Sequence, residues 1–222
     1  MALIGTQYAI CQEKVLSAEE LVVIEQKFHL RTDKSLANGV LKSRYSNEQL
    51  KAQGAIKNGQ AEGTWKEWYE NGQLYYDQSY VNGQLNGMAR IWYTNGQLYS
   101  KEFFEGGKKT GEKSLWYDSG QLKARCSFKY DKLEGVFKEW YKDGQLQSES
   151  YYKNDKKNGV HKTWHKNGHW KAEGVFEDGQ ISFQKIYLPG GDNSFLEMSY
   201  KDGKLTSEKT YYDGKLASET KH

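Results

Sequence analysis

The sequence predicts an all-β fold, an elongated single-layer antiparallel sheet of stacked β-hairpin repeats, each 24 residues long. Three observations predict it. The segment WYENGQL at 68–74 returns as WYTNGQL, WYDSGQL and WYKDGQL, and then as the divergent copy WHKNGHW, each 24 residues after the last. Asn-Gly or a related turn recurs every 11 to 13 residues, which suits short strands and not helices. The chain has a single proline, Pro189, so nothing interrupts strand pairing before it.

A series of glycines marks the repeat units. It runs at 24-residue spacing through Gly39, Gly63, Gly87, Gly111, Gly135 and Gly159. The first unit has Arg44-Tyr45 in place of Trp-Tyr, as expected of a degenerate unit at the end of a stack. We therefore predict an N-terminal cap over 1–38, six hairpin repeats over 39–182, and modified C-terminal repeats or a cap over 183–222. Twelve strands at about 4.8 Å each would span roughly 58 Å.

Each unit carries two turn signals and two short strands. In the second unit the turns are Asn71-Gly72 and Asn82-Gly83, and both can supply the residues of positive φ that a tight hairpin turn requires. The strand LYYDQSY between them alternates, with Leu74, Tyr76 and Tyr80 on one face. The intervening positions of the equivalent strands carry many charges. A period of two with charges on one side indicates a half-buried strand.

The length of the loop at Asn71-Gly72 determines which residues share a face. If the loop has two residues, Tyr69 lies opposite Leu74 and Trp68 lies opposite Tyr75. The tryptophans then line the more charged face, together with the predicted cross-strand pairs Lys66–Asp77, Lys138–Glu149 and Lys162–Glu173. A loop of three or five residues would shift the register by one and exchange the faces.

The overall composition excludes several classes of protein. Aromatic residues make up 14% of the chain, which indicates an ordered protein in spite of a mean hydropathy of −0.94. The 32 basic and 29 acidic residues are interspersed, which argues against nucleic-acid binding because that needs a concentrated basic face. No apolar run approaches the roughly 20 residues of a membrane span. The N-terminal segment lacks the features of a signal peptide, so we expect a cytoplasmic location.

The sequence offers little that could be catalytic. His161, His165 and His169 are the best candidates for a metal site, but no cysteine or carboxylate partner is implied, and two of them replace the tyrosine and glutamine of the repeat. Cys11 and Cys126 are too far apart in sequence to suggest a disulfide framework or a metal site. Cys126 occupies a small, inward position of the repeat. We therefore expect no enzyme activity, no cofactor and no bound metal.

The repeat unit resembles a known family. The pattern G-x-x-x-x-W-Y-x-N-G-Q-L, as in GTWKEWYENGQLYYDQSYVNGQLNG, is similar to the MORN-repeat variant over about 39–182. The upstream stretch LVVIEQKFHLRTDKSLANGV resembles the N-terminal segment of bacterial MORN-variant proteins of the YwqK antitoxin type. This resemblance favours strands over 21–38, whereas the capping pattern Ser17-x-x-Glu20 suggests a helix there. The loop at 188–193 is either an irregularity of the cap, which we favour, or a contact loop.

The resemblance implies an antitoxin or immunity protein that binds a cognate toxin directly and occludes it. A structural scaffold, which could associate with a membrane surface, is the alternative, and a surface adhesin is a third reading. Residues kept in every unit usually serve packing, whereas residues that differ between units are better candidates for partner specificity. The predicted partner-binding residues are Trp68, Tyr75, Trp92, Tyr99, Phe103, Trp116, Arg125, Trp140, Tyr151 and Trp164. The sequence leaves the oligomeric state undetermined.

Overall fold

A computed structural model describes residues 14–189 and 193–222, so Cys11 and part of the loop at 188–193 lie outside the described residues. Over this part of the chain the regular elements are strands, apart from one 3-10 turn at Ala18–Glu20. The predicted all-β fold of successive antiparallel hairpins is confirmed. Two compact units divide the chain, Met1–Gln84 and Leu85–His222, and each is described by itself.

The first unit is a meander of four strands with a small hairpin beside it. Strand β1 pairs in parallel with β4, β2 pairs with β3, and β4 to β7 pair in antiparallel order. The strands are β1 (Val15–Leu16), β2 (Leu21–Ile24), β3 (Lys27–Leu30), β4 (Gly39–Arg44), β5 (Leu50–Lys57), β6 (Gln60–Trp68) and β7 (Leu74–Val81).

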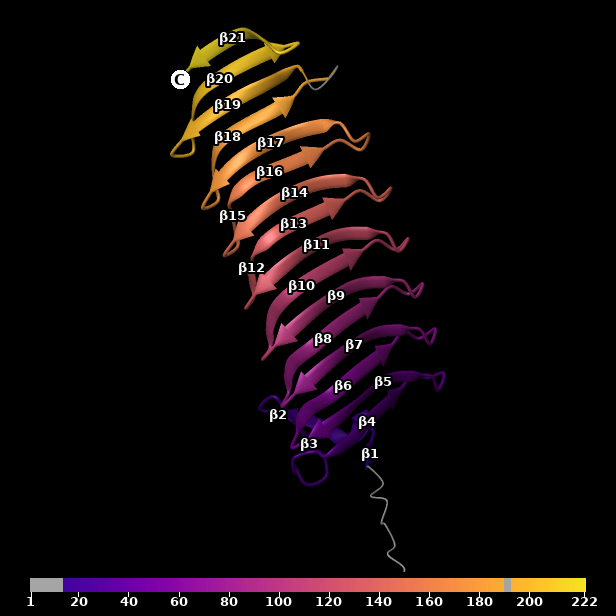
Figure 1. The fold of residues 1–222 in the computed structure, drawn as a ribbon. Helices are drawn as coiled ribbons and strands as arrows, with labels where there is room; N and C mark the ends of the chain where they lie inside the picture. Colours follow the sequence, from indigo (N-terminus) through magenta and orange to yellow (C-terminus); the bar gives the residue numbers. More distant parts are fainter. Residues whose placement is uncertain (1–13, 190–192) are drawn as a thin grey trace, which may run out of the picture. The chain divides into compact units, whose positions relative to one another are not determined.

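The second unit is a longer antiparallel meander whose strands follow one another in chain order (Figure 1). Short breaks at Glu134 and Asn158 separate β12 from β13 and β15 from β16. The strands are β8 (Gln84–Trp92), β9 (Leu98–Glu105), β10 (Lys108–Trp116), β11 (Leu122–Lys129), β12 (Lys132–Leu133), β13 (Gly135–Trp140), β14 (Leu146–Lys153), β15 (Lys156–Lys157), β16 (Gly159–Trp164), β17 (Trp170–Glu177), β18 (Gln180–Tyr187), β19 (Phe195–Lys201), β20 (Lys204–Tyr212) and β21 (Lys215–Lys221).

Two kinds of turn connect the strands. Asn82 and Gly83 both have positive φ, 50° and 76°, as a two-residue hairpin turn requires and as the sequence predicts. The turn at Asn71-Gly72 is different, because five residues separate Trp68 from Leu74 and only Gly72 has positive φ. The prediction of a two-residue loop at this position is therefore wrong.

The longer loop changes the register only at the end of the hairpin. Trp68 lies opposite Leu74, whereas the sequence-based register placed it opposite Tyr75. A β-bulge at Tyr75 then restores the alignment, so the predicted pair of Lys66 with Asp77 is confirmed. The bulge offsets the shift that a five-residue loop introduces, and the two faces do not exchange along the rest of the strand.

The other repeats have the same loop and the same bulge. The further pairs that the bulge produces are Trp92–Leu98, Trp116–Leu122, Trp140–Leu146 and Trp164–Trp170. The predicted pairs Lys138–Glu149 and Lys162–Glu173 are confirmed. We call the face that carries these tryptophans the tryptophan face. The opposite one, which carries the tyrosine of each Trp-Tyr pair, is the tyrosine face.

The N-terminal hairpin supplies the first unit with a compact core. Of the strands predicted over 21–38, β2 and β3 are present within 21–30, whereas 31–38 contains only an isolated bridge at Leu36. The capping box of Ser17 and Glu20 belongs to the short 3-10 turn before them. Phe28 of β3 stacks on Trp65 of β6 at 6.0 Å between ring centroids. The buried residues of this core are Leu16, Leu21, Ala37, Leu41, Ile56 and Trp65.

The C-terminal strands β18 to β21 continue the meander with longer pairings and without the Trp-Tyr loop. The described ends of the 188–193 loop are tied to the sheet. Leu188 N donates to Ser194 O at 2.8 Å, and Gly214 N donates to Asn193 O at 2.7 Å. Among the described residues, no helix is long and apolar enough to cross a membrane.

Candidate functional site

The tyrosine of the Trp-Tyr pair can join its repeat to the next one. In the second unit Tyr93, Tyr117 and Tyr141 each donate a hydroxyl hydrogen bond, at 2.8–2.9 Å, to the backbone carbonyl of the tryptophan 23 residues later. In the first unit Tyr45 makes the same bond at 2.7 Å, although Arg44 precedes it in place of tryptophan. This hydrogen bond explains why the repeat keeps the tyrosine.

The Asn-Gly-Gln part of the motif also serves the stacking of repeats. Asn95 Oδ1 accepts a hydrogen bond from Gln97 N at 3.0 Å, and Asn95 Nδ2 donates to Asp118 O of the next repeat at 2.8 Å. Gly120 has a φ of +86°, and a Cβ atom at this position would lie 2.8 Å from Gln97 Oε1. The asparagine therefore stabilises its own turn, while the glycine gives room to the glutamine of the preceding repeat.

The five repeated tryptophans are partly buried. Each lies opposite a leucine or, in the last copy, opposite Trp170, whose ring centroid is 5.0 Å from that of Trp164. Arg90 lies over the ring of Trp92 at 5.6 Å. The tryptophans therefore have packing partners different from those that the sequence predicts. Only part of each repeated tryptophan side chain is therefore open to a binding partner, and this holds for Trp68, Trp92, Trp116, Trp140 and Trp164.

The predicted binding residues that differ between repeats are more exposed and lie on both faces. Tyr75 and Tyr99 occupy bulge positions, are 37% and 38% exposed, and contact the tyrosines at 69 and 93. Phe103 and Tyr151, 39% and 43% exposed, lie on the tryptophan face, as does Arg125. The structure therefore does not gather the ten predicted residues into one site.

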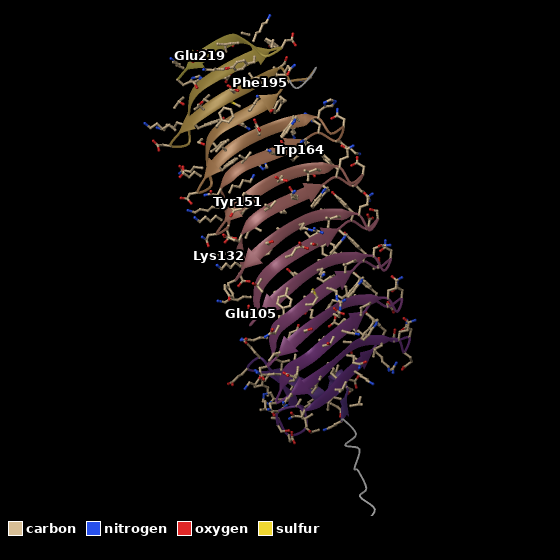
Figure 2. All side chains as sticks on the ribbon, viewed as in Figure 1. Glu105, Lys132, Tyr151, Trp164, Phe195 and Glu219 are labelled. Carbon is tan, nitrogen blue, oxygen red and sulfur yellow. The ribbon has the colours of Figure 1, made fainter. Side chains whose placement is uncertain are left out.

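Sequence reasoning missed an apolar row on the tryptophan face. Val136 and Tyr151 are cross-strand neighbours, as are Val160 and Val175, and all four are exposed. Figure 2 labels Tyr151 and Trp164, which lie towards opposite edges of the second unit, so the apolar row and the tryptophan row are separate. Exposed apolar patches of this kind mark interaction sites in soluble proteins. The 24-residue recurrence of Val136 and Val160 is the signal that could have revealed the row.

A shallow hollow of about 210 Å³ lies on the tyrosine face of β13, β14 and β16. His161 Nδ1 lies 2.6 Å from Ser150 Oγ within it, and Ser148 Oγ donates to Glu139 Oε2 at 2.8 Å. Burial lowers the pKa of His161, and the nearby Lys157 ammonium lowers it further. A neutral imidazole that bonds a buried serine is a stable packing arrangement, and nothing in the hollow orients it as a general base.

Two further groups of the second unit, the Cys126 thiol and the Glu102 carboxylate, have surroundings that serve packing and charge pairing. Burial raises the pKa of Cys126, which keeps the thiol protonated and unreactive. Glu102 lies 3.1 Å from Lys113 Nζ and 3.6 Å from Lys109 Nζ, so its charge is paired. Neither group is arranged for nucleophilic or acid–base chemistry.

The three histidines considered for a metal site occupy different environments. His161 lies in the hollow described above, whereas His165 and His169 are exposed in the loop that follows β16. Within residues 14–189 and 193–222, no three His, Cys, Asp or Glu side chains come together in a way that could hold a metal ion.

Comparison with known proteins identifies the repeat. Residues 61–82, 85–105, 109–130 and 133–154 match the family model of the MORN repeat variant. These four segments cover most of the second to fifth predicted units. No curated protein matches the chain. Four tandem segments of the chain thus match MORN-variant repeats, which suggest a repeat-based binding or scaffold protein.

Proposed function

We propose that this protein is a non-catalytic, protein-binding repeat protein that acts as an antitoxin or immunity protein in the cytoplasm. In this proposal it binds a cognate bacterial toxin directly and occludes its active site or substrate cleft. The observation that carries the proposal is that repeated and variable residues of the unit have different roles. The repeated Tyr, Asn, Gly and Gln side chains hold neighbouring repeats together, whereas several residues that vary, such as Phe103 and Tyr151, are exposed apolar residues.

The exposed residues have the chemistry of a protein-binding surface. Phe103, Tyr151 and Arg125 belong to residue types that are common in the energetically dominant parts of interfaces. A regular β-sheet presents them on a rigid support, which limits the conformational entropy lost on binding. The resemblance of the N-terminal segment to YwqK-type antitoxins supports the choice of a toxin as the partner.

The experiment co-expresses this chain with the toxin domain encoded by the neighbouring reading frame. We expect relief of toxicity and a complex that survives gel filtration. The double variant Phe103→Ser/Tyr151→Ser should lose both effects, while the control Tyr212→Ser, an equally drastic change at a 58% exposed position of β20, should keep them. Failure of the wild-type chain to rescue growth and to form the complex would refute the proposal.

A structural scaffold is the second candidate, since the MORN-variant repeats fit this role as well. Association with a membrane surface would need a lipid-facing basic area. A scaffold would bind its partners without affecting the growth of toxin-expressing cells. The same co-expression experiment therefore separates the two functions.

A further inference from the structure

One row of side chains runs across the tryptophan face of the second unit. The register of the strands determines which residues belong to it. Neighbouring members are direct cross-strand partners, although they are mostly 11 or 13 residues apart in sequence. We call it the charge row. Its members, in order from β8 to β21, are Arg90, Lys101, Ser114, Arg125, Lys138, Glu149, Lys162, Glu173, Lys185, Glu197, Lys209 and Glu219.

The charge row has two halves of opposite character. From Lys138 to Glu219 the charges alternate, so every cation has an anion beside it, as with the 2.8 Å contact of Lys138 with Glu149. From Arg90 to Lys138 all the charges of the row are positive. We call this half, on strands β8 to β13, the basic stripe.

Like charges placed directly opposite each other destabilise a sheet. The basic stripe contains two such pairs, Arg90 with Lys101 and Arg125 with Lys138. Anions compensate the second pair in part, because Glu112 Oε1 lies 3.6 Å from Arg125 Nε and Glu149 Oε2 lies 2.8 Å from Lys138 Nζ. Lys101 has no ion-pair partner among the described residues and is exposed. The alternating half shows that the same repeat can neutralise this row, so the fold does not require the cation at Lys101.

Apolar side chains lie on both sides of the basic stripe. Towards one edge are Trp92 and Trp116 with their opposing leucines, and towards the other are Met88, Phe103 and Val136. Phe103 and Val136 are 39% and 46% exposed. On β10 and β11 the second margin is polar, since Glu112 and Ser127 lie opposite each other there. Cations bordered by apolar side chains are complementary to a chain segment that carries both carboxylates and apolar residues.

We infer that the basic stripe is the docking site for an acidic segment of a protein partner, whose Asp and Glu side chains meet Lys101 and Arg125. The inference rests on the proposed function, because it assigns the chemistry of the surface by which the partner is recognised. Charge complementarity selects this occupant, since the apolar margins favour a polypeptide over a polyanion that lacks apolar groups. Opposed charges at such a surface supply specificity and fast association.

The test uses the full chain and a fluorescent peptide of about eight residues with alternating Glu and Leu, a length that spans five strands at about 4.8 Å. The double variant Lys101→Glu/Arg125→Glu should weaken binding about tenfold, and salt should weaken the binding of the wild type. The matched control is Lys123→Glu, which makes the same charge change as Arg125→Glu, also on β11 but on the tyrosine face, where Lys123 Nζ lies over Tyr117. This control should bind as the wild type does.

A stability measurement separates a binding role from a structural one. Lys101→Glu places an anion opposite Arg90, so its melting temperature should rise by about 2 °C while binding falls. Arg125→Gln serves as a milder second variant if the double variant does not fold. A peptide with Gln in place of Glu should not bind.

Three results would overturn the inference. The Gln peptide could bind as well as the Glu peptide, or Lys123→Glu could weaken binding as much as the double variant does. The third is that anionic vesicles or single-stranded DNA bind the stripe and the peptide does not. The same variants in the toxin co-expression experiment distinguish the two proposals. If the toxin is neutralised by all of them, the basic stripe is not the docking site and the proposed function stands. If the peptide binds at the stripe and no toxin is neutralised, the proposed function fails alone.

Discussion

The hydrogen bond between the tyrosine of one repeat and the tryptophan carbonyl of the next should measurably stabilise the stack. Tyr141→Phe removes only the hydroxyl that donates to Trp164 O at 2.9 Å. A hydrogen bond of this kind contributes about 1 kcal/mol net, and the carbonyl it leaves is partly buried. We therefore expect Tyr141→Phe to lower the free energy of unfolding by about 1 kcal/mol.

The equivalent bonds of Tyr93 and Tyr117 allow the effect to be summed. Successive sites are about 10 Å apart, because each repeat adds two strands at about 4.8 Å, so their effects should add. The triple variant Tyr93→Phe/Tyr117→Phe/Tyr141→Phe should lower the free energy of unfolding by about 3 kcal/mol. This is a large part of a typical total stability of about 5–15 kcal/mol. With an m-value of about 2.5 kcal/mol/M, the urea midpoint should fall by about 1.2 M.

The measurement is urea unfolding followed by tryptophan fluorescence. Tyr99→Phe is the matched control, because the Tyr99 ring packs against Tyr93 at 5.2 Å while its hydroxyl has no hydrogen-bond partner among the described residues. It should change the stability by less than about 0.5 kcal/mol. The reasoning is refuted if Tyr141→Phe costs no more than Tyr99→Phe and the triple variant unfolds at the wild-type midpoint.

Three further changes test other features of the structure. Gly54→Ala would place a Cβ atom 2.1 Å from Cε3 of the buried Trp65, so it should lower the melting temperature and cost about 1–3 kcal/mol by overpacking. Burial lowers the pKa of His161 below the value of about 6.5 expected in the unfolded chain, so the unfolded state binds more protons between the two pKa values. The free energy of unfolding should therefore be highest above about pH 6.5 and should fall as the pH drops below this value, as measured by urea titrations at several pH values. His161→Phe should flatten this dependence. The fold should tolerate this change, because Phe137 occupies the equivalent position of the preceding repeat. The Cys126 thiol, protonated and buried, should react with iodoacetamide much more slowly in the native protein than in urea.

Each of these has its own control. The double variant Gly54→Ala/Trp65→Leu should recover stability relative to the sum of the single changes if the steric conflict is the cause. His165→Phe, in an exposed loop, should leave the pH dependence as it is in the wild type. Cys126→Ser should fold normally, since Ser150 occupies the equivalent position of the next repeat. A native Cys126 that reacts as fast as the unfolded one would contradict the burial argument.

Much of the fold could be predicted because the repeat has a strict period and strong turn residues. The glycine series, the alternation in strands such as 74–80, and the pairs Lys66–Asp77, Lys138–Glu149 and Lys162–Glu173 all follow from local pattern. The partners of the tryptophans could not be predicted in the same way. Asn-Gly fits both a two-residue turn and a five-residue loop, and the bulge at Tyr75 hides the difference everywhere except at the last pair.

The candidate site was predictable only in part, for a related reason. Tyr151 and Phe103 were predicted because these positions differ between repeats, and the structure shows that both are exposed. The basic stripe was not predicted, because Arg90, Lys101 and Arg125 are dispersed in sequence among acidic residues and the chain shows no basic run. Strand pairing brings such distant residues together in one row.

The sequence by itself determined the unit of construction, since the 24-residue period, the turn residues and the alternation of side chains are local properties of the chain. It also indicated that the repeated Tyr-x-Asn-Gly-Gln residues serve the scaffold, because the copies at 69–73, 93–97, 117–121 and 141–145 retain most of them. Only the tertiary structure decided which side chains share a face near the long loops and which charges become neighbours. These depend on loop length, on the bulge and on cross-strand register, in which a shift of one residue moves every side chain to a different partner.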